Sequence, residues 1–439
     1  MKLALSLLWL LLATAASLRS SPASAYDGSK VYRIKAGRNI ASIHERLAGI
    51  ASDTWDQAHG NLDVVIPRGQ IATFEALRLK TRVLHADLGE SIAKEYVVKR
   101  KNWRQSNDSQ DPWFDSYHPY ADHVEWWRDL QGSFSNQSNL TSSGTSYEGR
   151  DIFGLHLWGA GGPRKPAVLY HGTVHAREWI ATPIIEYVAQ QLVEGYMSGN
   201  NITQAFLNNY DFYIFPFVKP DGFVYSQTNE RPWRKNRQPP PANAPNQTCF
   251  GRDVNRNWET NWDAEPRGAS PNPCSQTYRG VVPRDAPENG GLDDFVRKTR
   301  DAQGIKLFID WHSYSRLILS PFRHKETLYA PQLGKWTKAA VLVSEAIRAE
   351  STNATTFTFG PSGVVLYPTT GSSVDHIYTI SLAEFSYTIE LPDYGDFGFV
   401  LPPERIRPTV EGQWVGQQVL LSLLDEEFFN GEGPAILTL

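Results

Sequence analysis

The sequence has few cysteines, no strong excess of either charge and only one long apolar segment. Cys249 and Cys274 are the only cysteines among 439 residues, so the chain can form one internal disulfide at most. The formal net charge of -4 argues against nucleic acid or an anionic membrane as the main partner. Apart from residues 3–16, no stretch approaches the ~20 apolar residues that span a bilayer, so we expect no membrane anchor.

The N-terminal apolar segment has the features of a secretory signal peptide. Lys2 precedes the apolar run, and small residues follow it, including Ala23-Ser24-Ala25. A buried helix is the alternative, but these flanks favour a signal at residues 1–25, with cleavage there or earlier. Such a leader predicts a secreted, extracellular protein, and six N-x-S/T triplets are compatible with its glycosylation. Their asparagines are Asn107, Asn136, Asn139, Asn201, Asn246 and Asn353.

The two cysteines are most simply explained as a disulfide. Secreted proteins fold in an oxidising compartment, and the pair would close a loop of roughly 25 residues. Metal ligation or a catalytic thiol would need partners, which the flanking sequences "NQTCFGRD" and "NPCSQTY" do not offer. We therefore predict a bond between Cys249 and Cys274.

The length predicts more than one domain, because single cores usually stop growing at about 250–300 residues. Residues 26–100 read as a small α+β unit, with strands at 30–36, 62–67 and 81–87 and helices at 40–51 and 70–80. A basic, polar stretch follows, in which Lys99, Arg100 and Lys101 are consecutive. Residues 101–112 are interpreted as a linker that a processing protease could cut; a plain solvated linker is compatible with the same pattern.

Residues 113–439 have the pattern of a larger α/β domain. Strands are expected at 166–172, 210–218, 306–314 and 386–391, and a helix at 177–196. These strands are mostly apolar, which indicates a sheet covered on both faces.

The segment "HGTVHAREW" contains two pairs that could bind one metal ion. His171 and His175 are four residues apart, and His175 and Glu178 are three apart. A catalytic zinc requires three protein ligands and one open position. His312, at the expected carboxyl end of the strand in "FIDWHSYS", is the candidate third ligand, because open α/β sheets bind ligands at that edge.

Further polar residues stand in segments that could surround this ion. Glu390 lies in an apolar strand, where a carboxylate is costly unless it has a chemical role or a neighbouring cation. Arg231 and Arg234 could form surface ion pairs, or a cage for a carboxylate together with Asn255.

Six ordered segments then resemble the zinc metallocarboxypeptidases of the carboxypeptidase A and B type. They are "HAREW", "RPWRKNR", "DVNRNW", "DWHSYS", "LYPTTGSSVD" and "YTIELPDYGDFGF". The resemblance covers about residues 113–424, and residues 26–100 resemble the activation pro-domain of that family. It implies a mixed eight-stranded twisted sheet flanked by helices, preceded by a ferredoxin-like pro-domain. It also implies one Zn²⁺ per chain and hydrolysis of the last peptide bond of peptides and proteins.

The resemblance assigns roles to residues at matching positions. It implies that His175, Glu178 and His312 are the zinc ligands and that Asp253 orients a ligand histidine. Glu390 matches the general base that takes a proton from zinc-bound water, and Arg234 matches the stabiliser of the carbonyl and oxyanion. The residues that match substrate contacts are Arg177, Asn255, Arg256, Ser313, Tyr314 and Tyr367, with Asn255 and Arg256 holding the terminal carboxylate.

The local pattern agrees with the His175–Glu178 pair. A His171–His175 site needs one continuous helix, whereas "AVLYHG" is strand-like and Gly172 separates the histidines. We therefore expect His171 to make hydrogen bonds at the end of the strand.

Side-chain preference is expected from the "GSSVD" segment. Relatives that remove Lys or Arg resemble one another in placing an aspartate where this chain has Val374. Because valine cannot pair with a cation, we expect apolar or aromatic C-terminal residues to be preferred.

The leading hypothesis is therefore a secreted, monomeric zymogen that an activating protease cuts in the linker. A catalytically inactive, peptide-binding member is the alternative, and the retained Glu390, zinc ligands and Arg234 argue against it. A zinc endopeptidase is disfavoured because it would need no carboxylate clamp and usually shows "HExxH".

Overall fold

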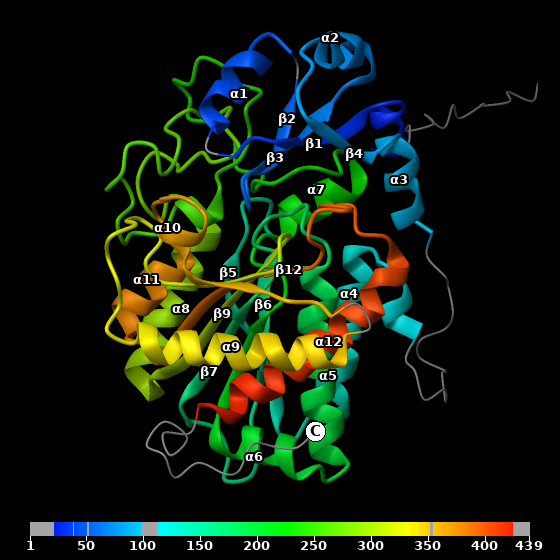
Figure 1. Cartoon of the computed structure of the whole chain (residues 1–439). Helices are drawn as coiled ribbons and strands as arrows, with labels where there is room; N and C mark the ends of the chain where they lie inside the picture. Colours follow the sequence, from blue (N-terminus) through cyan, green and yellow to red (C-terminus); the bar gives the residue numbers. More distant parts are fainter. Residues whose placement is uncertain (1–21, 38, 51, 98–111, 352–353, 425–439) are drawn as a thin grey trace, which may run out of the picture.

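The computed structural model describes residues 22–37, 39–50, 52–97, 112–351 and 354–424, which form two β-sheets with their helices (Figure 1). The smaller sheet belongs to the N-terminal unit. Its strands are β1 (Lys30–Lys35), β2 (Asp53–Asp56), β3 (Asn61–Ile66) and β4 (Thr81–His85). They pair in the antiparallel order β2-β3-β1-β4.

Helices complete this small unit. With α1 (Ile40–Leu47) and α2 (Ile71–Ala76), the element order is β-α-β-β-α-β, which is the ferredoxin-like arrangement expected from the resemblance. Alternate residues of β1 and β3, such as Tyr32 and Val64, pack with Phe74 of α2. The sequence patterns did not indicate β2 or the helix α3 (Leu88–Glu95).

The larger sheet has eight strands and is mixed, as expected. Its order is β11-β10-β12-β9-β7-β8-β6-β5. The strands are β5 (Ser138–Thr145), β6 (Asp151–Leu157), β7 (Ala167–His171), β8 (Asp211–Phe215), β9 (Ile305–Ser313), β10 (Leu317–Ser320), β11 (Thr358–Pro361) and β12 (Phe385–Leu391). The central strands β8, β7, β9 and β12 run parallel to their neighbours in this group, so their carboxyl ends share one edge.

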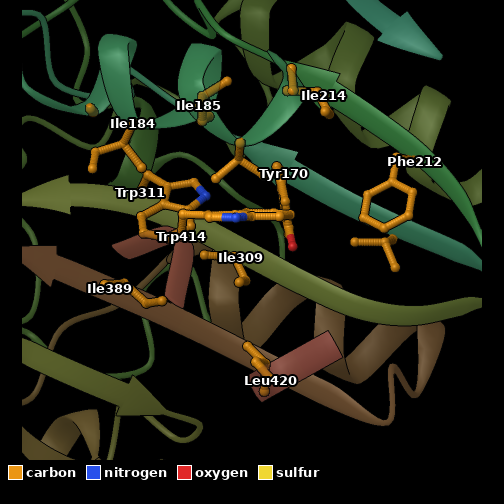
Figure 2. Close-up of a cluster of buried hydrophobic side chains, with 14 of the residues drawn as sticks. Tyr170, Ile184, Ile185, Phe212, Ile214, Ile309, Trp311, Ile389, Trp414 and Leu420 are labelled. Atoms are coloured by element: carbon orange, nitrogen blue, oxygen red, sulfur yellow. The ribbon is translucent and has the colours of Figure 1, made fainter. Parts of the chain in front are cut away.

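Helices cover both faces of this sheet, which explains the apolar character of its strands. The helices α5 (Ala181–Met197), α9 (Leu333–Glu350) and α12 (Ile406–Ser422) pack on one face. There Tyr170, Ile309 and Trp311 meet Ile184 and Trp414 (Figure 2). The opposite face packs against α8 (Pro287–Gln303) and α11 (Ser373–Ser381).

The remaining helices connect and close this core. They are α4 (Tyr120–Ser133), α6 (Asn201–Asn209), α7 (Pro220–Thr228) and α10 (Ser362–Val365). The predicted disulfide is confirmed, because Cys249 and Cys274 are bonded with an S–S distance of 2.04 Å. It joins the ends of a loop-rich segment between α7 and α8.

The N-terminal unit lies against the carboxyl edge of the large sheet, at the top of Figure 1. Asp63 of β3 accepts a hydrogen bond of 2.7 Å from the hydroxyl of Tyr314, just after β9. Glu95 of α3 receives two hydrogen bonds from Arg231, at 2.6 and 2.8 Å, and both side chains are fully buried. This contact corrects one expectation. Arg231 belongs to no carboxylate cage, because its guanidinium already binds Glu95.

Several predictions concern segments at the margins of the structure. The signal peptide lies outside the described residues except for its end, where Ala23 is buried with Leu88 and Ile92. The linker at 101–111 and the sequons Asn107 and Asn353 also fall outside the described residues. The other four sequon asparagines are exposed. Within the described part of the chain, none of the helices combines the length and apolar character needed to cross a membrane.

Candidate active site

Two of the predicted metal ligands lie in the turn between β7 and α5. The backbone N–H of Glu178 donates to the carbonyl of His175 at 3.1 Å, which forms a short turn before α5 begins. The turn brings His175 Nδ1 to 2.7 Å from Glu178 Oε1. The structure therefore brings together the pair with three-residue spacing.

The third predicted ligand comes from the end of β9. His312 Nδ1 lies 3.0 Å from Glu178 Oε2 and 3.1 Å from His175 Nδ1. The potential ligand atoms of these three buried residues all lie within 4.8 Å of one another. Two imidazoles and one carboxylate at this spacing form a donor set that fits a zinc ion.

His171 does not belong to this cluster. Neither of its ring nitrogens has a hydrogen-bond partner among the described residues, and its ring packs against Phe215, Phe308 and Trp258. The expectation of a hydrogen-bonding role is therefore wrong. His171 ends β7 on the face covered by the apolar cluster around Trp258, where burial lowers its pKa to about 4.

The electrostatic interactions within the cluster favour a positive charge. Burial opposes ionisation of Glu178, but His175 and His312 outweigh it and hold the pKa of Glu178 below its usual range. Burial also disfavours protonation of His312, yet Asp310 and Glu178 raise its pKa to about 10. Burial together with Arg234 lowers the pKa of His175 to about 4. The buried carboxylates therefore favour a positive charge in this cluster.

Asp253 links the cluster to the predicted oxyanion stabiliser. Its Oδ1 lies 3.3 Å from His175 Nε2, and its Oδ2 accepts hydrogen bonds of 3.1 and 2.7 Å from Arg234. The N–H of Asn255 also donates to Asp253 at 3.0 Å. Although burial opposes it, the charges of Arg234 and His175 hold the pKa of Asp253 well below its usual range. The carboxylate can therefore orient both side chains at once.

A second orienting carboxylate was missed by the sequence reasoning. Asp310 Oδ2 lies 3.0 Å from His312 Nε2, on the side of the ring opposite Glu178. Ser373 donates a hydrogen bond to the same carboxylate. The segment "DWH" contains a signal for this contact between Asp310 and His312, because residues two apart on a strand project from the same face of the sheet.

His175 and Glu178 of the cluster line a cavity of roughly 310 Å³ at the carboxyl edge of the sheet. Of the predicted substrate and catalytic residues, seven line it: Arg177, Arg234, Arg256, Ser313, Tyr314, Tyr367 and Glu390. Glu390 stands beside His312 in the parallel pairing of β12 and β9. Tyr367, which is 41% exposed, lies at the rim of the cavity.

Two predicted substrate contacts do not line the cavity. Asn255 is buried, with its Nδ2 3.3 Å from His312 Nε2 and its Oδ1 accepting from the N–H of Ser373 at 2.9 Å. Val374 is fully buried in α11. Arg323, which the sequence reasoning did not single out, lines the cavity instead.

The N-terminal unit contributes the outer wall of the cavity. Asp53, Thr54 and Trp55 of β2 line it, together with Gln57. Asp53 Oδ2 lies 3.9 Å from Arg177 Nη1, and the carbonyl of Trp55 accepts a hydrogen bond of 3.4 Å from Arg177 Nη2. The strand therefore stands where a peptide approaching Arg177 would lie.

The comparisons with known proteins agree with this geometry. The sequence profile described as zinc carboxypeptidase matches residues 123–416. A protein of Trichophyton verrucosum named metallocarboxypeptidase A-like protein is 39% identical over 415 residues, which cover 92% of this chain and 95% of that protein. The crystal structure of carboxypeptidase A from Helicoverpa armigera matches with a TM-score of 0.78 and 25% identity, covering 91% of this chain and 98% of that one. The structure of thrombin activatable fibrinolysis inhibitor matches with a TM-score of 0.80 and 24% identity, covering 91% and 99%, and supports the fold.

Proposed function

Since this chain belongs to the zinc carboxypeptidase family and is an enzyme of that class, we propose that His175, Glu178 and His312 hold its single zinc ion. The observation that carries the proposal is the convergence of this buried cluster with Arg234, Arg256 and Glu390 on one cavity. Bound zinc supplies Lewis acidity, which makes a water nucleophilic near neutral pH.

The protein's own groups handle the proton and the developing charge. Glu390 lies beside His312 and accepts the proton of the attacking water, then returns it to the leaving amine. Arg234 donates hydrogen bonds to the oxygen of the scissile carbonyl as negative charge grows there. Asp253 holds Arg234 in place by two hydrogen bonds, so little reorganisation is needed during the reaction.

Arg256 restricts the reaction to the end of the chain. Its Nη1 donates to the carbonyl of Asn255 at 2.7 Å, and its Nε has no hydrogen-bond partner among the described residues. A terminal carboxylate can pair with this guanidinium, and only the last peptide bond then reaches the metal. Tyr367 closes over the bound residue from the rim. The role of Asn255 in the clamp stays a prediction.

The N-terminal unit keeps the enzyme inactive until it is removed. The wall formed by β2 and the contacts of Asp53 and Trp55 with Arg177 support this role, because a peptide needs the same space. Cleavage in the linker by an activating protease would free the unit. Secretion, glycosylation and a monomeric state stay predictions.

The proposal is tested by comparing the intact protein with protein cut in the linker by trypsin. Both are supplied with zinc and a set of peptides that differ only in their last residue, and the products are identified by mass spectrometry. We expect loss of single C-terminal residues with the cut protein and little turnover with the intact one. Cleavage at internal bonds would contradict the carboxypeptidase assignment, and equal activity of both forms would contradict the zymogen assignment alone.

A further inference from the structure

The cavity contains four arginines, of which the proposed mechanism and the contact with the N-terminal unit account for three. Arg177, Arg234, Arg256 and Arg323 all line it. Arg234 is paired with Asp253, and Arg256 is reserved for the terminal carboxylate. Arg177 faces Asp53, which leaves with the N-terminal unit. Arg323 is the member of this set that has neither an ion pair among the described residues nor a role in the proposed mechanism.

Arg323 is buried without a polar partner for most of its head group. The residue is 5% exposed, and neither its Nε nor its Nη1 has a hydrogen-bond partner among the described residues. No ion pair within the described part of the chain includes it. An uncompensated buried guanidinium is costly, and a protein retains one where a ligand supplies the missing charge.

The backbone of Arg323 is fixed by its neighbours. Its N–H donates to both carboxylate oxygens of Asp375, at 2.9 Å each, and its carbonyl accepts from the N–H of Thr369 at 2.9 Å. Asp375 also receives hydrogen bonds from the N–H and the ring of His324. This carboxylate is therefore occupied by the loop. The anchored loop fixes the start of the Arg323 side chain, which reduces the entropy lost on binding an anion.

The cavity around Arg323 favours an anion over an apolar side chain. Burial lowers the pKa of Arg256 to about 10. The positive charge of Arg323 also lowers this pKa, whereas the negative charge of Asp253 opposes the lowering. The two guanidinium groups thus repel each other within one binding region. The Nε atoms of both guanidinium groups are buried without a hydrogen-bond partner among the described residues. An apolar group placed there would leave all these polar atoms unsatisfied.

We infer that Arg323 selects the side chain of the last residue and that the enzyme prefers C-terminal residues with a carboxylate side chain. This inference rests on the proposed function, in which Arg256 binds the main-chain carboxylate of the same residue. A C-terminal glutamate or aspartate offers two carboxylates, one for each guanidinium.

This inference departs from the apolar preference expected from Val374. The absence of an aspartate at that position still predicts that basic residues are disfavoured. Val374 itself is fully buried and does not line the cavity, so its apolar side chain offers a substrate no direct contact surface.

The test uses the activated enzyme with zinc and four peptides that end in glutamate, glutamine, phenylalanine or lysine. Glutamate and glutamine have nearly the same shape, so their ratio of kcat/KM measures charge recognition. We expect glutamate to exceed glutamine by about tenfold or more, as for a charged hydrogen bond. In Arg323→Gln this ratio should fall toward one, and in Arg323→Lys part of it should remain. Arg267→Gln is the matched control, because this side chain is 96% exposed; it should keep the wild-type ratio.

Each contrary outcome has a distinct meaning. A wild-type ratio near one, with phenylalanine or lysine preferred, would overturn the role of Arg323 while leaving the carboxypeptidase function intact. A fall in kcat/KM by the same factor for all four peptides in Arg323→Gln would also overturn it, because Arg323 would then serve the main-chain carboxylate. If none of the peptides lost its last residue, the proposed function itself would fail.

Discussion

Each histidine of the metal cluster is oriented by a carboxylate on its far side. Asp253 faces His175 and Asp310 faces His312, while Glu178 lies between the two rings. Such partners fix the ring orientation and raise the basicity of the ligand nitrogen. The burial of all five residues keeps these interactions out of water, where they are strongest.

The catalytic role proposed for Glu390 predicts a specific loss of turnover. Glu390→Gln removes the proton acceptor but leaves the three metal ligands, so kcat should fall by about 10²–10⁴-fold while zinc content stays at one per chain. Steady-state kinetics and elemental analysis measure the two quantities. Glu384→Gln, at the residue before β12, is the matched control and should retain turnover. Substantial activity in Glu390→Gln would show that another group accepts the proton.

Asp310 is predicted to act as a positioning residue for zinc binding. Asp310→Asn should weaken zinc affinity by about 10–100-fold, because His312 loses its orienting carboxylate. Competition for zinc between the folded protein and a chelator of known affinity measures the zinc affinity. Asp293→Asn breaks a similar buried bond, at 2.7 Å to His376, outside the cluster and should leave zinc affinity unchanged. Equal weakening in both variants would indicate a general loss of packing.

At the scale of elements, strands and helices with strong periodicity were predicted from the sequence. Elements whose conformation depends on contacts with neighbouring elements were missed. The apolar strands β7, β8, β9 and β12 and the long helix α5 were found, because alternation and helical spacing persist over many residues. The strand β2 has only four residues, "DTWD", with one apolar side chain. Its conformation depends on pairing with β3 and on the cavity beneath it, which no local pattern records.

The same limit applies to the candidate site. The three proposed metal ligands were predicted through a resemblance over six segments, and their convergence follows from where β7 and β9 end. The partner of Arg231 could not be predicted, since Glu95 lies 136 positions away in a helix that the patterns did not indicate. Arg323 was overlooked because an arginine in a loop is usually a solvated surface residue. Its burial became apparent only in the folded chain.

The helix α3 is predicted to hold the N-terminal unit in place through Glu95. Glu95→Gln leaves Arg231 buried without a counter-ion, and breaking such a pair typically costs about 3–5 kcal/mol. The uncut variant should therefore show higher activity than the uncut wild type, measured with the same peptide. Glu90→Gln lies in the same helix, where its side chain is 71% exposed, and should behave like the wild type. Unchanged activity in uncut Glu95→Gln would mean that other contacts suffice to hold the unit.

At the scale of the whole molecule, the two units meet at the edge where the large sheet presents its polar residues. The large domain supplies the cluster, the cavity and the arginines, and the small unit supplies the wall that covers them. One polypeptide thus contains both the site and its cover, joined by a segment with consecutive basic residues. The family assignment and this arrangement together lead to the central claim that the enzyme recognises the free carboxyl end of a peptide chain.

That claim is tested most directly with one peptide in two forms, one with a free C-terminal carboxylate and one with a C-terminal amide. The activated, zinc-supplied enzyme should release the last residue of the acid form and leave the amide form almost uncut, because Arg256 requires a carboxylate. A zinc chelator should stop the reaction, and added zinc should restore it. Equal rates on the two forms would contradict selection of the chain end by Arg256.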